Sequence, residues 1–150
     1  MLFRSRSVEM ASFDNACFHI VAGEIRIAEG HPLEAVKLLN EANHEYPMAL
    51  SHESIARLDE LRGDWIAAIG EWQQVLASRG EILHDHSPAD WVLAHLAVAR
   101  AYSKVQEYDS ADRYYRAFLQ LWKSSDRLTS KNEAFHELEL LEARTQVPRG

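Results

Sequence analysis

Histidine and glutamate side chains offer the first chemistry to consider in this sequence. Three His-Glu pairs begin the helical pattern in which two histidines, four residues apart, bind zinc beside a glutamate base. These pairs are His44-Glu45, His52-Glu53 and His136-Glu137. The residue four positions after each histidine is Met48, Ala56 or Leu140, and none of these supplies the second imidazole. The pairs therefore do not predict a zinc protease.

His84, Asp85 and His86 form a second candidate metal site, because imidazole nitrogens bind zinc, copper and nickel. Adjacent ligands without a distant partner are more typical of a solvated loop. Cys17 has no evident histidine base, and the sequence holds neither a GxSxG motif nor a phosphate-binding glycine loop. We therefore predict no catalytic residue, no bound metal and no cofactor. A metal-dependent enzyme that uses His84 and His86 is the least favoured alternative.

The composition limits the classes of partner. The chain has 150 residues, of which 47% are hydrophobic, and this is enough for a single domain with a continuous core. A net charge of -7 disfavours a surface for DNA or RNA. The single cysteine, Cys17, cannot form an internal disulfide, and no stretch is apolar for long enough to be a signal peptide or a membrane span. These features predict a soluble cytoplasmic protein that contacts neither nucleic acid nor membrane.

The elements that carry these residues are predicted to be helices. Apolar residues recur at helical spacing, and no run alternates in the manner of a strand. Gly30 and Gly63 each end a helical run, while Pro32 and Asp64 suit the start of the helix that follows. The sequence therefore predicts an all-α chain of helical hairpins. A flexible lead-in is expected at residues 1–12, followed by a single domain over residues 13–145.

The spacing of small residues indicates a repeat. The interval from Ala35 to Ala68 equals the interval from Gly30 to Gly63, and a longer interval separates Ala68 from Ala111. This pattern resembles the tetratricopeptide repeat (TPR), whose period is about 34 residues. Three histidines occupy the place of its signature tryptophan, namely His19, His52 and His95. The resemblance implies a right-handed α-solenoid of three TPR-like hairpins, at about residues 16–48, 49–80 and 92–123.

Two further segments complete the predicted architecture. The longer interval before Ala111 places an inserted loop at about residues 80–88, with Ser87 and Pro88 opening the next helix. Ser130 and Glu133 have capping-box spacing, and a capping helix is expected at about residues 130–145. Its apolar face consists of Ala134, Phe135, Leu138 and Leu141. The three repeated histidines are interpreted as half-buried polar residues that bridge the two helices of each hairpin, since equivalent side chains lie too far apart to share a zinc ion.

TPR domains are interaction scaffolds in which the first helices of successive hairpins line a concave groove. The resemblance implies that the groove is lined by Ile20, Glu24, Leu50, Glu53, Arg57, Leu93, Leu96, Arg100 and Lys104. The basic, asparagine-rich clamp of the chaperone-binding members is absent here. Apolar residues beside Arg57, Arg100 and Lys104 instead suggest an amphipathic partner segment that carries some acidic residues.

We therefore expect a non-enzymatic scaffold that binds a protein or peptide. The third hairpin is also similar to the C-terminal TPR tails of bacterial regulatory proteins, and this similarity would make the chain a docking or sensing module. The alternative is a structural module that self-associates, as in a homodimer, through an open end of the repeat stack.

Overall fold

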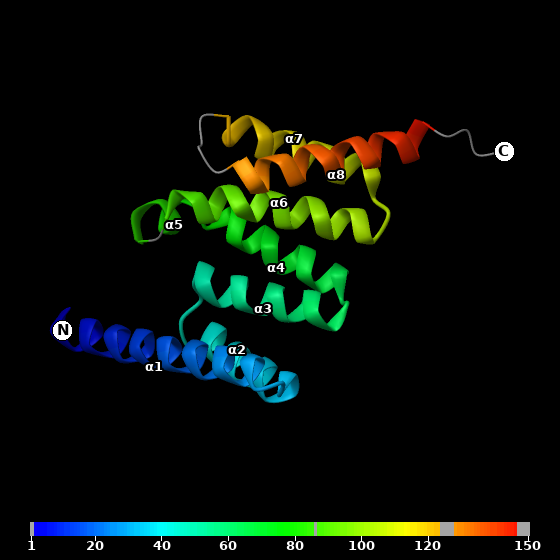
Figure 1. Ribbon diagram of the computed structural model, residues 1–150. Helices are drawn as coiled ribbons and strands as arrows, with labels where there is room; N and C mark the ends of the chain where they lie inside the picture. Colours follow the sequence, from blue (N-terminus) through cyan, green and yellow to red (C-terminus); the bar gives the residue numbers. More distant parts are fainter. Residues whose placement is uncertain (1, 86, 124–127, 147–150) are drawn as a thin grey trace. The chain divides into compact units, whose positions relative to one another are not determined.

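The computed structural model describes residues 2–85, 87–123 and 128–146, and almost all of them are helical (Figure 1). Eight helices occupy these residues, and no strand is found among them. The helices are α1 (Leu2–Ala28), α2 (Pro32–Glu45), α3 (Ala49–Arg62), α4 (Trp65–Ala77), α5 (Arg79–Asp85), α6 (Pro88–Lys104), α7 (Tyr108–Leu121) and α8 (Leu128–Gln146). The all-α prediction is confirmed. Within the same residues, none of the helices combines the length and hydrophobicity needed to cross a membrane.

The chain packs as two compact units. Unit 1 comprises Met1–Ser78 and unit 2 comprises Arg79–Gly150. Unit 1 contains α1 to α4, and unit 2 contains α5 to α8. The single domain expected over residues 13–145 spans both units and stays a prediction.

In unit 1, the helix ends lie where the sequence placed them. Gly30 and Gly63 have φ angles of 78° and 76°, which favour glycine and end α1 and α3. Pro32 opens α2 at a position whose missing amide costs no hydrogen bond. The Asp64 side chain accepts a hydrogen bond from the backbone N–H of Ala67 at 3.2 Å and caps α4. These signals divide the unit into the hairpins α1–α2 and α3–α4, whose helices pack on each other.

Small residues let the helices of each hairpin approach closely. Ala35 of α2 and Ala68 of α4 are fully buried, as is Ala111 of α7 in unit 2. Large side chains fill the space one turn later in all three helices. These side chains are Leu39, Trp72 and Tyr115. The predicted hairpin register is therefore present in both units.

Unit 2 is built on the hairpin α6–α7, with α8 packed against α7. The Ser87 hydroxyl accepts a hydrogen bond from the backbone N–H of Ala89 at 3.2 Å, which confirms the predicted cap of α6. Ala134, Leu138 and Leu141 of α8 are buried in one hydrophobic cluster with residues of α6 and α7. Phe135, predicted to share this face, is instead exposed.

Three predicted boundaries differ from the structure. The segment 1–12, expected as a flexible lead-in, is helical from Leu2, because no glycine or proline interrupts α1 before Gly23. Most of the expected loop at 80–88 is the short helix α5, whose Ile82 is buried. The Ser130 to Glu133 spacing is not a helix start, since α8 already begins at Leu128.

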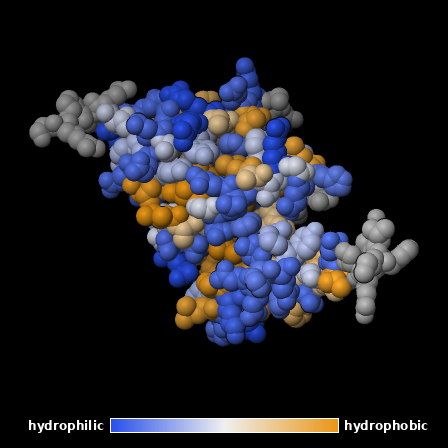
Figure 2. All heavy atoms as spheres, turned by 180° about the vertical axis from the view of Figure 1, so that it is seen from behind, coloured by the Kyte–Doolittle hydropathy of each residue, from blue (hydrophilic) through white to orange (hydrophobic). Residues whose placement is uncertain are grey.

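The exposed surface is mostly polar. On the face drawn in Figure 2, hydrophilic residues cover most of the visible area, and hydrophobic residues show in separate patches among them. Large apolar side chains such as Leu33, Leu61 and Ile66 are exposed in unit 1. Apolar residues exposed singly are normal on a folded protein, whereas a row of them along one helix calls for an explanation.

Candidate interaction surface

In unit 1, the predicted groove residues lie on α1 and α3, and their charges are paired with one another. Arg57 Nη2 of α3 donates to Glu24 Oε1 of α1 at 2.9 Å. Arg57 Nη1 also lies 3.8 Å from Glu53 Oε1, one turn away on α3. Leu50 is half-buried at the start of α3, whereas Ile20 belongs to the core of the unit. Ile20 therefore supports the surface from beneath rather than lining it.

In unit 2, the predicted groove residues lie on α6, and α8 supplies their main partners. Arg100 Nε donates to both oxygens of Glu137, at 3.1 and 3.0 Å. Arg100 Nη2 donates to Glu137 Oε1 at 2.8 Å and to Glu133 Oε2 at 3.1 Å. Leu93 is half-buried, Lys104 is exposed, and Leu96 is a core residue. The structure thus brings Arg100 together with two glutamates that the sequence did not assign to the surface.

The Arg100 cluster is held by a buried tyrosine as well. Tyr115 of α7 donates from its hydroxyl to Glu137 Oε2 at 2.9 Å. Hydrogen bonding to Glu137 raises the pKa of the Arg100 guanidinium above its ordinary value, because the bonds favour the charged form. Burial raises the pKa of Tyr115 to about 12. Glu137 is therefore fixed by two donors and in turn orients Arg100.

These pairings change the expected chemistry of the surface. Arg57 meets two carboxylates on α1 and α3, and Arg100 meets two carboxylates on α8. Each cluster therefore has a net charge of -1 and not a free positive charge. An acidic segment would be repelled by such clusters as much as attracted. The predicted preference for acidic residues in the partner rested on Arg57, Arg100 and Lys104, and the pairing of the two arginines removes their support for it.

The same ion pairs reveal a common register in the two units. The interval from Glu24 to its partner Arg57 equals the interval from Arg100 to its partner Glu133. Residues one repeat apart thus face each other across α1 and α3, and again across α6 and α8. The signal was present in the sequence, because both charge pairs share the spacing of Ala35 and Ala68.

Two of the three repeated histidines, His19 and His52, bridge the two helices of their own hairpins as predicted, whereas His95 is buried and its polar contact lies within its own helix. His19 Nδ1 of α1 lies 3.6 Å from Glu45 Oε2 of α2, and His52 Nδ1 of α3 lies 2.6 Å from Glu71 Oε2 of α4. His95 Nδ1 lies 3.0 Å from the backbone oxygen of its own helix at Trp91, and its ring contacts Tyr114 of α7. Burial lowers the pKa of His95 below its ordinary value.

The structure describes only part of the candidate metal site at residues 84–86. His84 lies near the end of α5 and is exposed, while His86 lies outside the described residues. Among the residues that the structure describes, no three His, Cys, Asp or Glu side chains are grouped closely enough to hold a metal ion.

No family model matches the chain, and no match to a curated protein was found.

Proposed function

We propose that this chain is a TPR-like helical-repeat scaffold that binds another protein or a peptide on the surface of its first helices. These helices are α1 and α3 in unit 1 and α6 in unit 2. The observation that carries the proposal is the register shared by the pairs Arg57–Glu24 and Arg100–Glu133, whose members lie one repeat apart. Such a register places equivalent side chains side by side, and a periodic surface suits an extended or helical segment.

The helical packing supports the same proposal. Each hairpin buries a fully enclosed alanine at the same position, as is typical of repeats that stack into a right-handed α-solenoid. The proposed stack consists of α1–α2, α3–α4 and α6–α7, with α8 as its capping helix. A docking or sensing role in a bacterial regulatory system fits this architecture, since such scaffolds hold partners without chemistry of their own. A cytoplasmic location is part of the proposal, because the free thiol of Cys17 needs no oxidising compartment.

The proposed surface has a mixed character that defines its partner. Leu50 and Leu93 present half-buried apolar area, and the charged groups around them are largely neutralised within each unit. Ion pairs at the edge of a binding surface determine how a partner aligns and which partners are excluded, and they add little affinity. We therefore expect an amphipathic partner segment whose apolar side chains provide most of the affinity.

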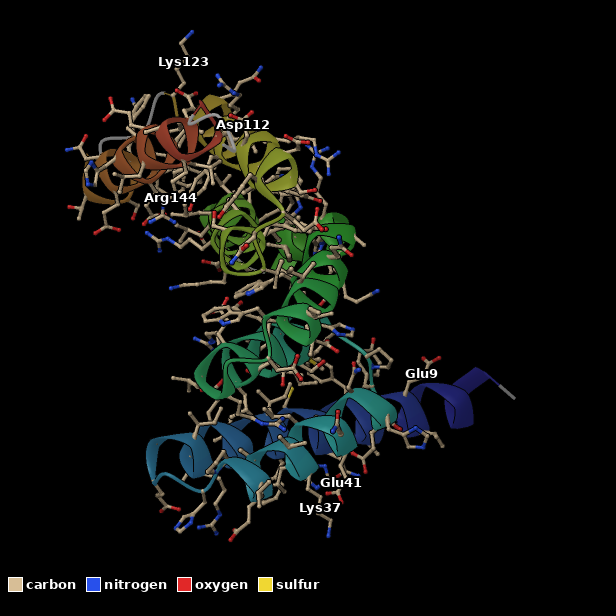
Figure 3. All side chains as sticks on the ribbon, turned by 90° about the vertical axis from the view of Figure 1, so that its right-hand side faces the viewer. Glu9, Lys37, Glu41, Asp112, Lys123 and Arg144 are labelled. Carbon is tan, nitrogen blue, oxygen red and sulfur yellow. The ribbon has the colours of Figure 1, made fainter. Side chains whose placement is uncertain are left out.

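Site-specific photo-crosslinking tests this proposal. A photoreactive amino acid replaces Arg57 on α3 or Lys104 on α6, and the protein is irradiated in the cells that naturally produce it. Both positions should capture the same partner. The matched control is Lys37, which points away from the body of unit 1 on the outer side of α2, beside Glu41 (Figure 3). Equal capture at Lys37, or capture at Lys37 alone, would move the binding surface elsewhere.

A further inference from the structure

Helix α1 has apolar side chains on two opposite faces, and only one of these faces is covered. Ala16, Ile20 and Gly23 lie against the rest of unit 1 and are buried. On the opposite face, Phe18, Val21 and Ile25 remain 69%, 60% and 51% exposed. A helix that is apolar on both sides is typically buried on both sides. The second face of α1 therefore lacks the contact that its composition suits.

The equivalent face of α3 shows what such a face normally contacts. Positions of α1 and α3 are equivalent when they are separated by the interval between Glu24 and Arg57. By this measure the equivalents of Phe18, Val21 and Ile25 are Ser51, Ser54 and Leu58. These last three residues are buried in unit 1, at 0%, 0% and 1% exposure. Ser51 Oγ donates to Asn43 Oδ1 of α2 at 3.1 Å, and α2 packs on α3. The face of α3 is thus covered by the second helix of the preceding hairpin.

Unit 2 repeats this arrangement independently. Leu58 and Ala134 occupy equivalent positions, because each directly follows a residue that forms an ion pair with the first helix of its unit. Arg57 precedes Leu58 and faces α1, and Glu133 precedes Ala134 and faces α6. Ala134 is fully buried in the cluster that α8 forms with α6 and α7. Ile25 directly follows Glu24 and so occupies the same position on α1. Where a second helix precedes it within a unit, this face is covered by that helix.

The exposed face of α1 also has the spacing of a helix-pairing seam. Its positions alternate by three and four residues, and all six are exposed. They are Ala11, Asp14, Phe18, Val21, Ile25 and Ala28. This is the a/d pattern that packs one helix against another over several turns. Helix α1 has 27 residues where α2 has 14, and its amino-terminal part extends past α2 (Figure 1).

We propose that this α1 seam binds the α1 seam of a second copy of the chain, with the two helices antiparallel. In that alignment Phe18 lies opposite Val21 of the second copy, Ala11 lies opposite Ala28, and Asp14 lies opposite Ile25, so a and d positions share each layer. The Asp14 layer contributes no affinity, because its carboxylate must stay hydrated at the edge of the seam. Beside the seam, Cys17 of one copy lies near Glu24 of the other, and Asn15 lies near Ala22. None of these pairs brings like charges together. A parallel pair would instead place the two Asp14 carboxylates side by side. The seam is therefore self-complementary in the antiparallel sense alone, as a two-fold interface requires.

The length of the seam sets the strength to expect. Residues 11 to 28 extend over roughly 27 Å at a rise of about 1.5 Å per residue. A two-helix contact of this length is smaller than the standard interface of about 800 Å² per partner. The dimer should therefore form reversibly and should be detected as a concentration-dependent increase in mass. The proposal goes beyond the partner-binding role, because the six seam positions are not residues of the partner-binding surface. Glu24 flanks the seam, whereas its partner Arg57 and Lys104 lie outside it.

Sedimentation of the full chain tests the proposal, from about 1 μM to about 1 mM, which brackets weak association. The wild type should shift from monomer to dimer within this range. A Phe18→Glu/Val21→Glu variant should raise the dissociation constant by at least about 100-fold, because it replaces the apolar central layers of the seam with carboxylates that face one another. A Leu61→Glu/Ile66→Glu variant adds the same charge at exposed apolar positions of unit 1 and should dimerise like the wild type. A monomeric wild type would assign the face to a different helix and overturn the proposal, as would a dimer lost only in the control variant.

Disulfide trapping tests the antiparallel alignment without introducing charged residues into the seam. Chains with Ala11→Cys and chains with Ala28→Cys, each also carrying Cys17→Ser, are oxidised separately and as a mixture. The mixture should cross-link at least about tenfold faster than either chain alone, because only the 11-to-28 pair falls within disulfide reach. Faster cross-linking of Ala11→Cys chains with one another would show a parallel pair and refute the proposed geometry.

Discussion

A single methyl group added to Gly23 tests the close approach of α1 and α2. A Cβ built on Gly23 would lie 2.8 Å from both Cγ and Cδ2 of Leu39. Leu39 is fully buried in the core of unit 1, so its side chain cannot swing outward to make room. The equivalent residues of the other hairpins, Ala56 and Ala99, already carry a methyl group and are also buried. Gly23 is therefore a packing requirement of the first hairpin alone.

Two opposing terms set the size of the effect. Alanine in place of an interior helical glycine stabilises the helix by about 1 kcal/mol. Overpacking a filled core costs about 1 to 3 kcal/mol. We expect the Gly23→Ala variant to lose between about 0 and 2 kcal/mol in the free energy of unfolding. Gly70 of α4 is the matched control, because nothing lies within 4 Å of its added Cβ. The Gly70→Ala variant should gain about 1 kcal/mol.

Urea denaturation followed by circular dichroism measures both variants against the wild type. Gly23 and Gly70 belong to the same unit, so separate unfolding of unit 2 does not affect their comparison. Their free energies should differ by about 1 to 3 kcal/mol, the overpacking cost alone. A Leu39→Ala change should cost less in the Gly23→Ala background than in the wild type, because the two sites are coupled. Equal stabilisation by both glycine replacements would refute the packing of α1 against α2.

Two further predictions concern buried polar groups. Glu137→Ala removes the acceptor shared by Arg100 and Tyr115 and should lower the free energy of unfolding by about 1 to 2 kcal/mol, whereas Glu142→Ala should leave the urea midpoint nearly unchanged. Burial lowers the pKa of His95 below 6.5, so the unfolded chain binds more protons there and stability falls as the pH drops below this value. A His95→Gln variant should lose this part of the dependence between about pH 7 and about pH 5, and identical profiles would contradict it.

The hairpins could be predicted because their signals are local. Gly30 and Gly63 end helices through a backbone conformation that few other residues adopt, and Pro32 opens one through a fixed φ. The spacing of Ala35 and Ala68 then fixed which faces meet. The glycine and proline signals act within one turn of helix, and the alanine spacing repeats from one hairpin to the next. Local chemistry therefore sufficed for the order of the hairpin helices and for the core of each hairpin.

The helix limits that were missed lack such signals. No helix-breaking residue marks the start of α1, and its weak periodicity before Phe13 suggested a lead-in, although helix propensity there is adequate. The polar segment after Gly80 was expected as a loop, but burial of Ile82 accompanies a short helix. Helix propensity alone therefore extends α1, whereas tertiary packing accompanies α5, and a sequence pattern does not report that packing.

The candidate surface was harder to predict than the fold. Arg57 and Arg100 lie on α3 and α6 as expected, but their charge was assigned to a partner. The glutamates at Arg100 lie far away in the sequence, and the pairing of Arg57 with Glu24 across two helices was not inferred. Whether a charge is free depends on contacts between helices that are a full repeat or more apart along the chain. A residue type therefore identifies a candidate, and only the neighbouring helix determines its chemistry.

The apolar seam of α1 also depends on which neighbouring helix covers it. Terminal units of repeat proteins usually present a polar outer face, since no neighbour covers them. Here the first helix carries Phe18 and Val21 where α3, covered by α2, carries Ser51 and Ser54. The uncovered helix is thus more apolar than its covered counterpart, which is the reverse of a cap. An apolar exposed face of this kind marks an interaction site, and the self-complementary spacing of the α1 seam favours a second copy of the chain as its occupant.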